Sequence, residues 1–204
     1  MPETPPAPGP QDVYGAVDAG PEVLLTFDDG PHPTLTPKLL DCLAEHGATG
    51  VFFVIGQRVA SPAGRAIIRR AHAEGHRIGN HTFTHPDLTK LTEAQVRDEI
   101  VRTGDLLTEF LTDHKLFRPP YGAHNSVVDR VVRELDYHMV LWNVDSEDWR
   151  RKPDAWVEPS VASIGSRASS TFLCHDIHPT TVDNFPGFLA KVAAIPRVRF
   201  VQYA

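Results

Sequence analysis

VLLTFDDGPHPTLTPKLLDCLAEHGATGVFFVI, residues 23–55, contains the pattern that decides the fold. Two apolar runs, residues 23–27 and 51–55, are typical of buried strands because both are continuous rather than alternating with polar residues. Between them, Thr36 is the expected helix N-cap, with a proline at the first helical position, and Gly47 ends the helical pattern. A strand, a helix and a second strand in this order predict a parallel β-α-β unit.

The same alternation continues to the end of the chain. Further strands are expected at residues 76–79, 115–120, 138–144, 171–175 and 198–202, and further helices at 61–75, 92–111, 127–135 and 181–195. Seven apolar strands that alternate with helices indicate an α/β domain built from parallel units. A closed or nearly closed barrel is our first expectation, and an open, doubly wound sheet is the second.

Composition and charge narrow the class of protein. The 204 residues are 41% apolar and 23% charged, which is typical of one globular domain. The formal net charge of -6, without a basic stripe, argues against nucleic acid as the main partner. No apolar run is long enough to span a membrane. Cys42 and Cys174 fall within a helical and a strand pattern, so we expect two buried free thiols.

The N-terminal segment differs from the rest of the chain. Residues 1–20 are rich in proline and are interpreted as a lead-in, while residues 21–204 form the expected catalytic domain. The segment lacks the charged and apolar regions of a secretory signal. We expect a secreted or cell-surface monomer whose signal lies outside this sequence, and a cytoplasmic location stays open.

Reactive side chains follow the ends of most of the expected strands. In chain order they are Asp28 and Asp29, His81 and His85, Arg118, Asp148, and His175. The carboxyl ends of the strands in a parallel barrel all open on one face, where catalytic groups collect. Residues that are far apart in the sequence are therefore expected to converge at one site.

The segment HTFTHP, residues 81–86, points to a metal ion. Two imidazoles four residues apart can lie on the same side of one turn, and Pro86 favours a turn over a long helix. Of the adjacent acids at residues 28–29, one can bind the ion while the other stays free as a base. Such a set leaves coordination positions open, as catalytic ions require, although it also suits non-haem iron oxygenases. Two unrelated surface histidines are the alternative interpretation of this spacing alone.

The remaining motifs supply acid–base chemistry. The prolines of RPPYG make a rigid loop that can aim a backbone N–H at an oxyanion, and Arg118 can hold a carboxylate or form a structural salt bridge. Asp148 can orient a histidine, and His175 is then a suitable general acid rather than a core residue. Trp149 is expected at an aromatic wall or in the core. His32 is expected either at the site or in a solvated loop.

Together, TFDDGPH, HTFTH, RPPYG, DSEDW and LCHDIH resemble the five ordered motifs of the polysaccharide deacetylase family, the NodB-homology domain of carbohydrate esterase family 4. The resemblance covers about residues 22–203 and implies a distorted, TIM-barrel-like (β/α)7 barrel. It implies a metal-dependent hydrolase that removes N-acetyl groups from GlcNAc-containing glycans, either peptidoglycan or chitin and its oligosaccharides. An acetylxylan O-deacetylase and an inactive sugar-binding module are the alternatives.

The resemblance also implies a role for each matching residue. It makes Asp28 the catalytic base, Asp29, His81 and His85 the ligands of a divalent metal, Arg118 the partner of the base, Tyr121 the backbone donor to the oxyanion, Asp148 the acid that tunes the catalytic histidine, Trp149 the aromatic wall, Leu173 the floor of the acetyl pocket, and His175 the general acid. Zinc is the expected metal, and the N/O donors also suit Co²⁺ or Ni²⁺.

Overall fold

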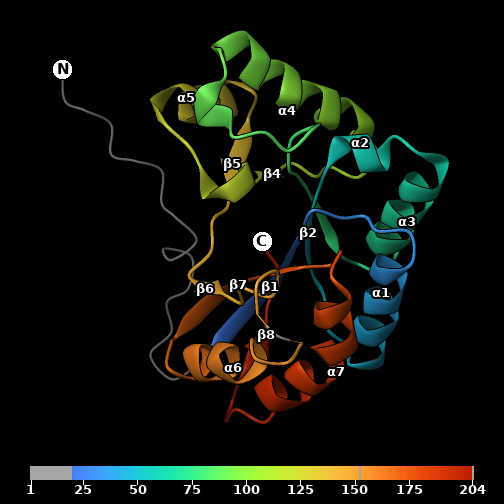
Figure 1. Cartoon of the computed structure of the whole chain (residues 1–204), viewed down its shortest axis with the longest axis vertical. Helices are drawn as coiled ribbons and strands as arrows, with labels where there is room; N and C mark the ends of the chain where they lie inside the picture. Colours follow the sequence, from blue (N-terminus) through green and yellow to red (C-terminus); the bar gives the residue numbers. More distant parts are fainter. Residues whose placement is uncertain (1–19, 152, 204) are drawn as a thin grey trace.

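A computed structural model describes residues 20–151 and 153–203. Nearly all of the predicted lead-in, residues 1–19, lies outside this part of the chain. The strands are β1 (Glu22–Asp28), β2 (Gly50–Val54), β3 (Arg77–Asn80), β4 (Lys115–Phe117), β5 (Tyr137–Met139), β6 (Val144–Asp145), β7 (Ser169–His175) and β8 (Arg199–Phe200). The α-helices are α1 (Leu35–Glu45), α2 (Gly56–Val59), α3 (Pro62–Ala73), α4 (Glu93–Leu107), α5 (Ser126–Glu134), α6 (Val157–Gly165) and α7 (Pro179–Ala193). Figure 1 shows the helices arranged around the strands.

The parallel strands curve into a barrel. Their order is β5-β4-β3-β2-β1-β7-β6, and β8 pairs with the beginning of β1. The outermost strands, β5 and β6, follow each other in the chain and are joined by residues 140–143. At one end of this connection Val140 N–H donates to the Phe117 carbonyl, at 2.8 Å, and at the other Asn143 N–H donates to Thr171, at 3.2 Å. The connection therefore links the two edges of the sheet, and the predicted (β/α)7 barrel is confirmed.

The expected single strand at residues 138–144 is wrong in detail. The structure divides it into β5, which pairs with β4, and β6, which pairs with β7. The interruption has a physical cause, because the Val140 and Leu141 carbonyls accept hydrogen bonds from the Arg118 guanidinium, at 2.9 and 3.2 Å. At this point the hydrogen-bond donor to the backbone is therefore the Arg118 side chain and not a neighbouring strand.

Apolar side chains cover both faces of the central strands. On the outer face, Phe27 of β1 stacks on Phe52 of β2 with ring centroids 4.7 Å apart, and α1, α6 and α7 pack over them. Inside the barrel, β1, β2 and β4 contribute a second buried cluster around Phe53. Burial on both faces explains why the strands are continuous apolar runs. Both cysteines are buried and free, as expected.

The helix ends follow the local sequence in most cases. Ser61 caps α3 by accepting the Gly64 N–H at 3.0 Å, and Thr92 forms a capping box with Gln95 at the start of α4. However, α4 ends at Leu107 rather than near residue 111. The sequence did not predict α2 or α6, and no described helix is both long and apolar enough to be a membrane span.

The start of α1 requires a correction. Thr36 is not its N-cap, because the helix already begins at Leu35. The ring of His32 performs the capping instead, with Nδ1 accepting the N–H groups of Thr34 and Leu35 at 3.3 and 3.2 Å. A histidine that faces the first helical turn in this way satisfies amides that would otherwise lack partners.

Candidate active site

A cavity of about 360 Å³ opens at the carboxyl ends of the strands. Its lining residues come from five separate segments of the chain and are Asp28, Asp29, His81, His85, Tyr121, Trp142, Asp145, Trp149, Leu173, His175 and His178. The parallel register brings them together, since the end of β1 is level with the ends of its neighbours: Asp28 is paired with Phe53 of β2 and with His175 of β7. The barrel thus gathers most of the residues that the sequence analysis singled out.

Asp29, His81 and His85 form a compact cluster within this cavity. Asp29 Oδ1 lies 3.5 Å from His81 Nε2 and 3.1 Å from His85 Nε2. One potential ligand atom from each residue lies within 4.8 Å of the others. The two imidazoles are held by an irregular loop rather than by a helix, as the proline after His85 predicted.

His81 is oriented by the backbone of a neighbouring strand. Its Nδ1 lies 2.7 Å from the Arg118 carbonyl oxygen, which can only accept a hydrogen bond. Nδ1 therefore carries the hydrogen, and in the neutral ring Nε2 presents its lone pair to Asp29. This is the arrangement by which a second partner fixes the tautomer of a metal-binding histidine.

The cluster fits a divalent cation on two further grounds. Asp29 Oδ1 is a buried carboxylate oxygen without a hydrogen-bond partner among the described residues. Burial would raise the pKa of Asp29, but the neighbouring imidazoles of His81 and His85 outweigh burial and lower that pKa below its usual range. An ionised carboxylate and two imidazoles are the donor set of a three-ligand catalytic site.

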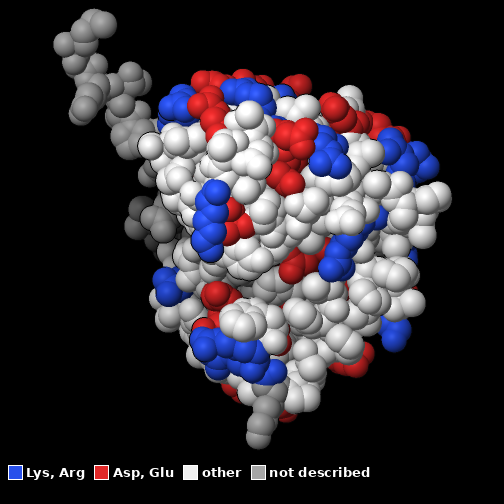
Figure 2. All heavy atoms as spheres, turned by 45° about the horizontal axis from the view of Figure 1, so that its top comes forward, with Lys and Arg blue, Asp and Glu red and all other residues white. Residues whose placement is uncertain are grey.

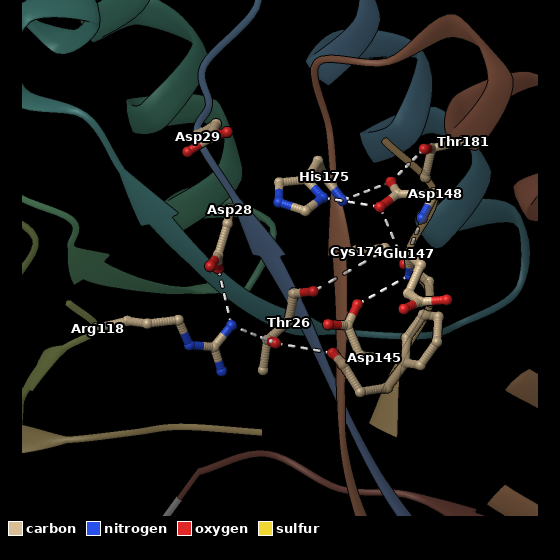
Figure 3. A network of polar contacts seen from close by, with 12 residues as sticks. Thr26, Asp28, Asp29, Arg118, Asp145, Glu147, Asp148, Cys174, His175 and Thr181 are labelled. Carbon is tan, nitrogen blue, oxygen red and sulfur yellow. Dashed lines mark hydrogen bonds and ion pairs between the residues drawn. The ribbon is translucent and has the colours of Figure 1, made fainter. Parts of the chain in front are cut away.

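Asp28, unlike its neighbour Asp29, points toward Arg118 (Figure 3). Arg118 Nη1 donates to Asp28 Oδ1 at 2.8 Å and to the Thr26 hydroxyl at 2.7 Å. The guanidinium is fully buried and lies 4.2 Å from the centre of the Phe53 ring. The other carboxylate oxygen of Asp28 lies 3.7 Å from His81 Nε2. Asp28 therefore has one oxygen held by a cation and one directed toward the metal-ligand cluster.

His175 of β7, the register partner of Asp28, is held by Asp148 (Figure 3). His175 Nδ1 donates to Asp148 Oδ1 at 2.7 Å, and the backbone N–H of His175 donates to Asp148 Oδ2 at 2.9 Å. Thr181 and Ser146 also donate to this carboxylate through their hydroxyl groups. Burial lowers the pKa of His175, but the Asp148 carboxylate, with Asp28 and Asp29, raises it to about 9. His175 is therefore an imidazolium at neutral pH.

Three residues around the cavity have left-handed backbone conformations. The φ angles are 74° at Asp29, 63° at His85 and 61° at Tyr121. Such angles cost non-glycine residues on the order of 1–3 kcal/mol each and are concentrated at functional sites. At Tyr121 the conformation follows two prolines, and its exposed ring packs edge-on against His85 with centroids 4.8 Å apart. All three of these strained residues line the cavity.

Leu173 and Trp149 line the cavity, as the sequence analysis expected. Leu173 is buried, whereas Trp149 is 60% exposed at the rim, so a place in the core is wrong for it. Trp142 and His178 also line the cavity, although the sequence patterns do not indicate a role for either. Trp142 had been placed within an expected strand, and His178 belongs to the LCHDIH motif but was given no role. His32 does not belong to the metal-ligand cluster or the cavity lining, because it caps α1.

Comparison with known proteins agrees with this geometry. A family model described as polysaccharide deacetylase matches residues 16–140, which is more than half of the chain. The chain belongs to the polysaccharide deacetylase family. This membership confirms the family that the motifs predicted, and the family's metal dependence agrees with the Asp29, His81 and His85 cluster.

Individual members of the polysaccharide deacetylase family resemble the chain closely. A chitin deacetylase of Arthroderma benhamiae is 37% identical over 79% of this chain, and the peptidoglycan-N-acetylglucosamine deacetylase PgdA of Listeria monocytogenes is 36% identical over 83%. The matches span only 45% and 35% of those two proteins. A family 4 carbohydrate esterase from Streptomyces lividans, in complex with acetate, superposes with a TM-score of 0.80 at 30% identity, covering 91% of this chain and 94% of that one.

Proposed function

We propose that this protein removes N-acetyl groups from a GlcNAc-containing glycan and that the reaction depends on a metal ion. The observation that carries the proposal is the composition of one cavity. A cluster of one carboxylate and two imidazoles lines the same cavity as an arginine-held aspartate and an aspartate-held histidine. The printed names of the chitin and peptidoglycan deacetylases support the same reaction and substrate class.

Asp29, His81 and His85 would hold the metal ion. We propose zinc, which favours a three-ligand set of carboxylate and imidazole donors in catalytic sites, while Co²⁺ and Ni²⁺ suit the same donors. When bound, such an ion lowers the pKa of water to about 7 and polarises a carbonyl oxygen.

Asp28 and His175 are suited to opposite proton transfers. Arg118 occupies one oxygen of Asp28, so the other can take a proton from water as the water oxygen bonds to the acetyl carbon. His175 can donate its Nε2 proton to the amide nitrogen while Asp148 holds Nδ1. The C–N bond then breaks, and acetate and a free amine leave.

The walls of the cavity fit an acetylated sugar. Leu173 offers an apolar floor for the acetyl methyl group, and the exposed face of Trp149 can pack against a sugar ring. We assign the backbone N–H of Tyr121 to the oxyanion; the assignment is supported by the place of Tyr121 in the cavity lining and by the contact of its ring with His85. A secreted or cell-surface location and a monomeric state stay predictions.

Acetate release from a panel of glycans tests the proposal. Chitooligosaccharide, peptidoglycan and acetylxylan are each incubated with the protein, with and without a chelator. We expect acetate from a GlcNAc-containing glycan, loss of release with the chelator, and recovery when Zn²⁺ is added back. Release from acetylxylan alone would identify an O-deacetylase. Glycan binding without acetate release by the metal-loaded protein would identify a sugar-binding module.

A further inference from the structure

Glu99 of α4 contacts the loop that carries the two histidines of the metal-ligand cluster. Its Oε2 accepts the backbone N–H groups of Phe83 and Thr84, at 2.8 and 2.7 Å. Its Oε1 accepts the Thr84 hydroxyl at 2.7 Å. The side chain is only 9% exposed, so these contacts are shielded from competing water. All three donors lie between His81 and His85 in the sequence.

The backbone N–H groups of residues 82–85 in this loop depend on side chains for their hydrogen bonds. Residues 81–85 belong to neither a helix nor a strand, and the φ angles of Thr82 and His85 are 67° and 63°. Asn80 Oδ1 accepts the Thr82 N–H at 2.9 Å, and the Thr82 hydroxyl accepts the His85 N–H at 3.1 Å. With the two bonds to Glu99, every backbone N–H from Thr82 to His85 has a side-chain acceptor. A strained conformation persists only where surrounding groups hold it in this way.

Other contacts attach the loop to the same helix. Asn80 Nδ2 donates to the Ile100 carbonyl at 2.8 Å, and the Arg102 guanidinium lies 3.7 Å from the centre of the Phe83 ring. Helix α4 is itself joined to α5 by ion pairs of Arg130 with Glu93 and of Arg97 with Glu134. Figure 2 shows acidic and basic residues interspersed on the face that includes these helices. The loop therefore rests on an anchored helix.

We propose that Glu99 is a positioning residue that pre-organises His81 and His85 for the metal ion. The inference rests on the proposed metal site and extends it to a residue of α4 that contacts no ligand atom of that site. Carboxylate acceptors make hydrogen bonds to N–H groups that are about twice as strong as neutral ones. A loop already held in its metal-binding conformation loses less entropy when the ion binds. Loss of Glu99 should therefore weaken metal binding.

The test measures Zn²⁺ affinity of the metal-stripped protein by competition with a chromophoric chelator. Glu99→Ala removes all three contacts, and we expect it to lower the affinity by about 10- to 100-fold, the effect typical of groups that orient metal ligands. Glu99→Gln keeps the shape but replaces the carboxylate by a neutral acceptor, and an approximately 3- to 10-fold loss is expected. Asp105→Ala is the matched control, because Asp105 is an exposed acid on the same helix. The Zn²⁺ affinity of Asp105→Ala should equal that of the wild type.

Hydrogen exchange provides a readout that does not depend on activity. In the metal-free protein, a peptide covering residues 81–86 should exchange faster in Glu99→Ala and in Glu99→Gln than in the wild type or Asp105→Ala. If Glu99→Ala does not fold, Glu99→Gln decides the question by the same two measurements. Wild-type affinity and wild-type exchange in a folded Glu99 variant would overturn the inference. A wild-type protein that does not bind Zn²⁺ would instead refute the proposed metal site.

Discussion

Arg118 and Asp28 form a buried ion pair in which Nη1 of the arginine lies 2.8 Å from Oδ1 of the aspartate. The same guanidinium donates to the Thr26 hydroxyl and to the Val140 and Leu141 carbonyls. One arginine therefore holds the proposed base and ties β4 to β1 and to the connection that closes the barrel. Its backbone carbonyl also orients His81. Arg118 is therefore expected to contribute both to the reaction and to the stability of the fold.

Arg118→Lys should reduce both activity and stability. A lysine keeps the positive charge but cannot satisfy the planar set of acceptors around Arg118, so buried carbonyl groups lose their donors. We expect kcat to fall at least about 100-fold and the free energy of unfolding to fall by about 2–4 kcal/mol. Urea denaturation and steady-state kinetics measure these effects. Wild-type stability would show that the carbonyl contacts contribute little.

Asp28→Asn and His81→Ala should separate proton transfer from metal binding. The amide introduced by the first change cannot act as a base, but it leaves the three proposed ligands in place, so turnover should fall at least about 1000-fold with Zn²⁺ affinity nearly unchanged. His81→Ala removes a ligand and should reduce both quantities. Acetate release and chelator competition give the two values. Wild-type kcat in Asp28→Asn would refute the role of Asp28 as the base.

The pH dependence of activity should reflect His175. As a general acid it must be protonated, and its pKa is raised to about 9, so kcat/KM should decline as the pH rises through about 9. Asp148→Asn removes the charge that stabilises the imidazolium, so the pKa of His175 falls and the alkaline decline moves to lower pH. Profiles of kcat/KM for both proteins check this shift. Identical alkaline declines would exclude His175 as the titrating acid.

Asp176 should make the stability of the metal-free protein depend on pH. Burial, with the nearby charge of Asp29, raises the pKa of Asp176 to about 7, although a hydrogen bond from Thr36 opposes this shift. The folded state then binds a proton more tightly than the unfolded state, whose aspartate titrates near pH 4. The contribution of Asp176 to stability is therefore complete below about pH 4 and is lost as the pH rises to about 7.

Asp176→Asn is the variant that isolates this contribution. An amide oxygen can still accept the Thr36 hydroxyl, but the side chain no longer titrates. Relative to the wild type, the variant should gain free energy of unfolding between about pH 4 and pH 7. Denaturation of both metal-free proteins across this range measures the difference. A difference that does not change with pH would contradict the raised pKa.

Local sequence patterns predicted much of the barrel. The apolar runs at residues 23–27 and 51–55 became β1 and β2, and Thr92 with Gln95 began α4, because these signals depend only on neighbouring residues. The patterns failed where side-chain hydrogen bonds to the backbone intervened. Arg118 takes the carbonyls that would extend β5, and the His32 ring occupies the capping position assigned to Thr36. Neither contact can be recognised from the apolar runs or the helix-capping signals in the sequence.

The sequence by itself determined the parallel α/β domain and placed the reactive residues at the carboxyl ends of its strands, because strands that are joined by helices run parallel to one another. Only the tertiary structure decided the directions of the adjacent carboxylates, with Asp28 toward Arg118 and Asp29 toward the histidines. It also joined Glu99 to the histidine loop across 15 and 16 residues of chain. Side-chain direction depends on backbone angles such as the φ of 74° at Asp29. Packing between segments that are distant in the sequence sets those angles.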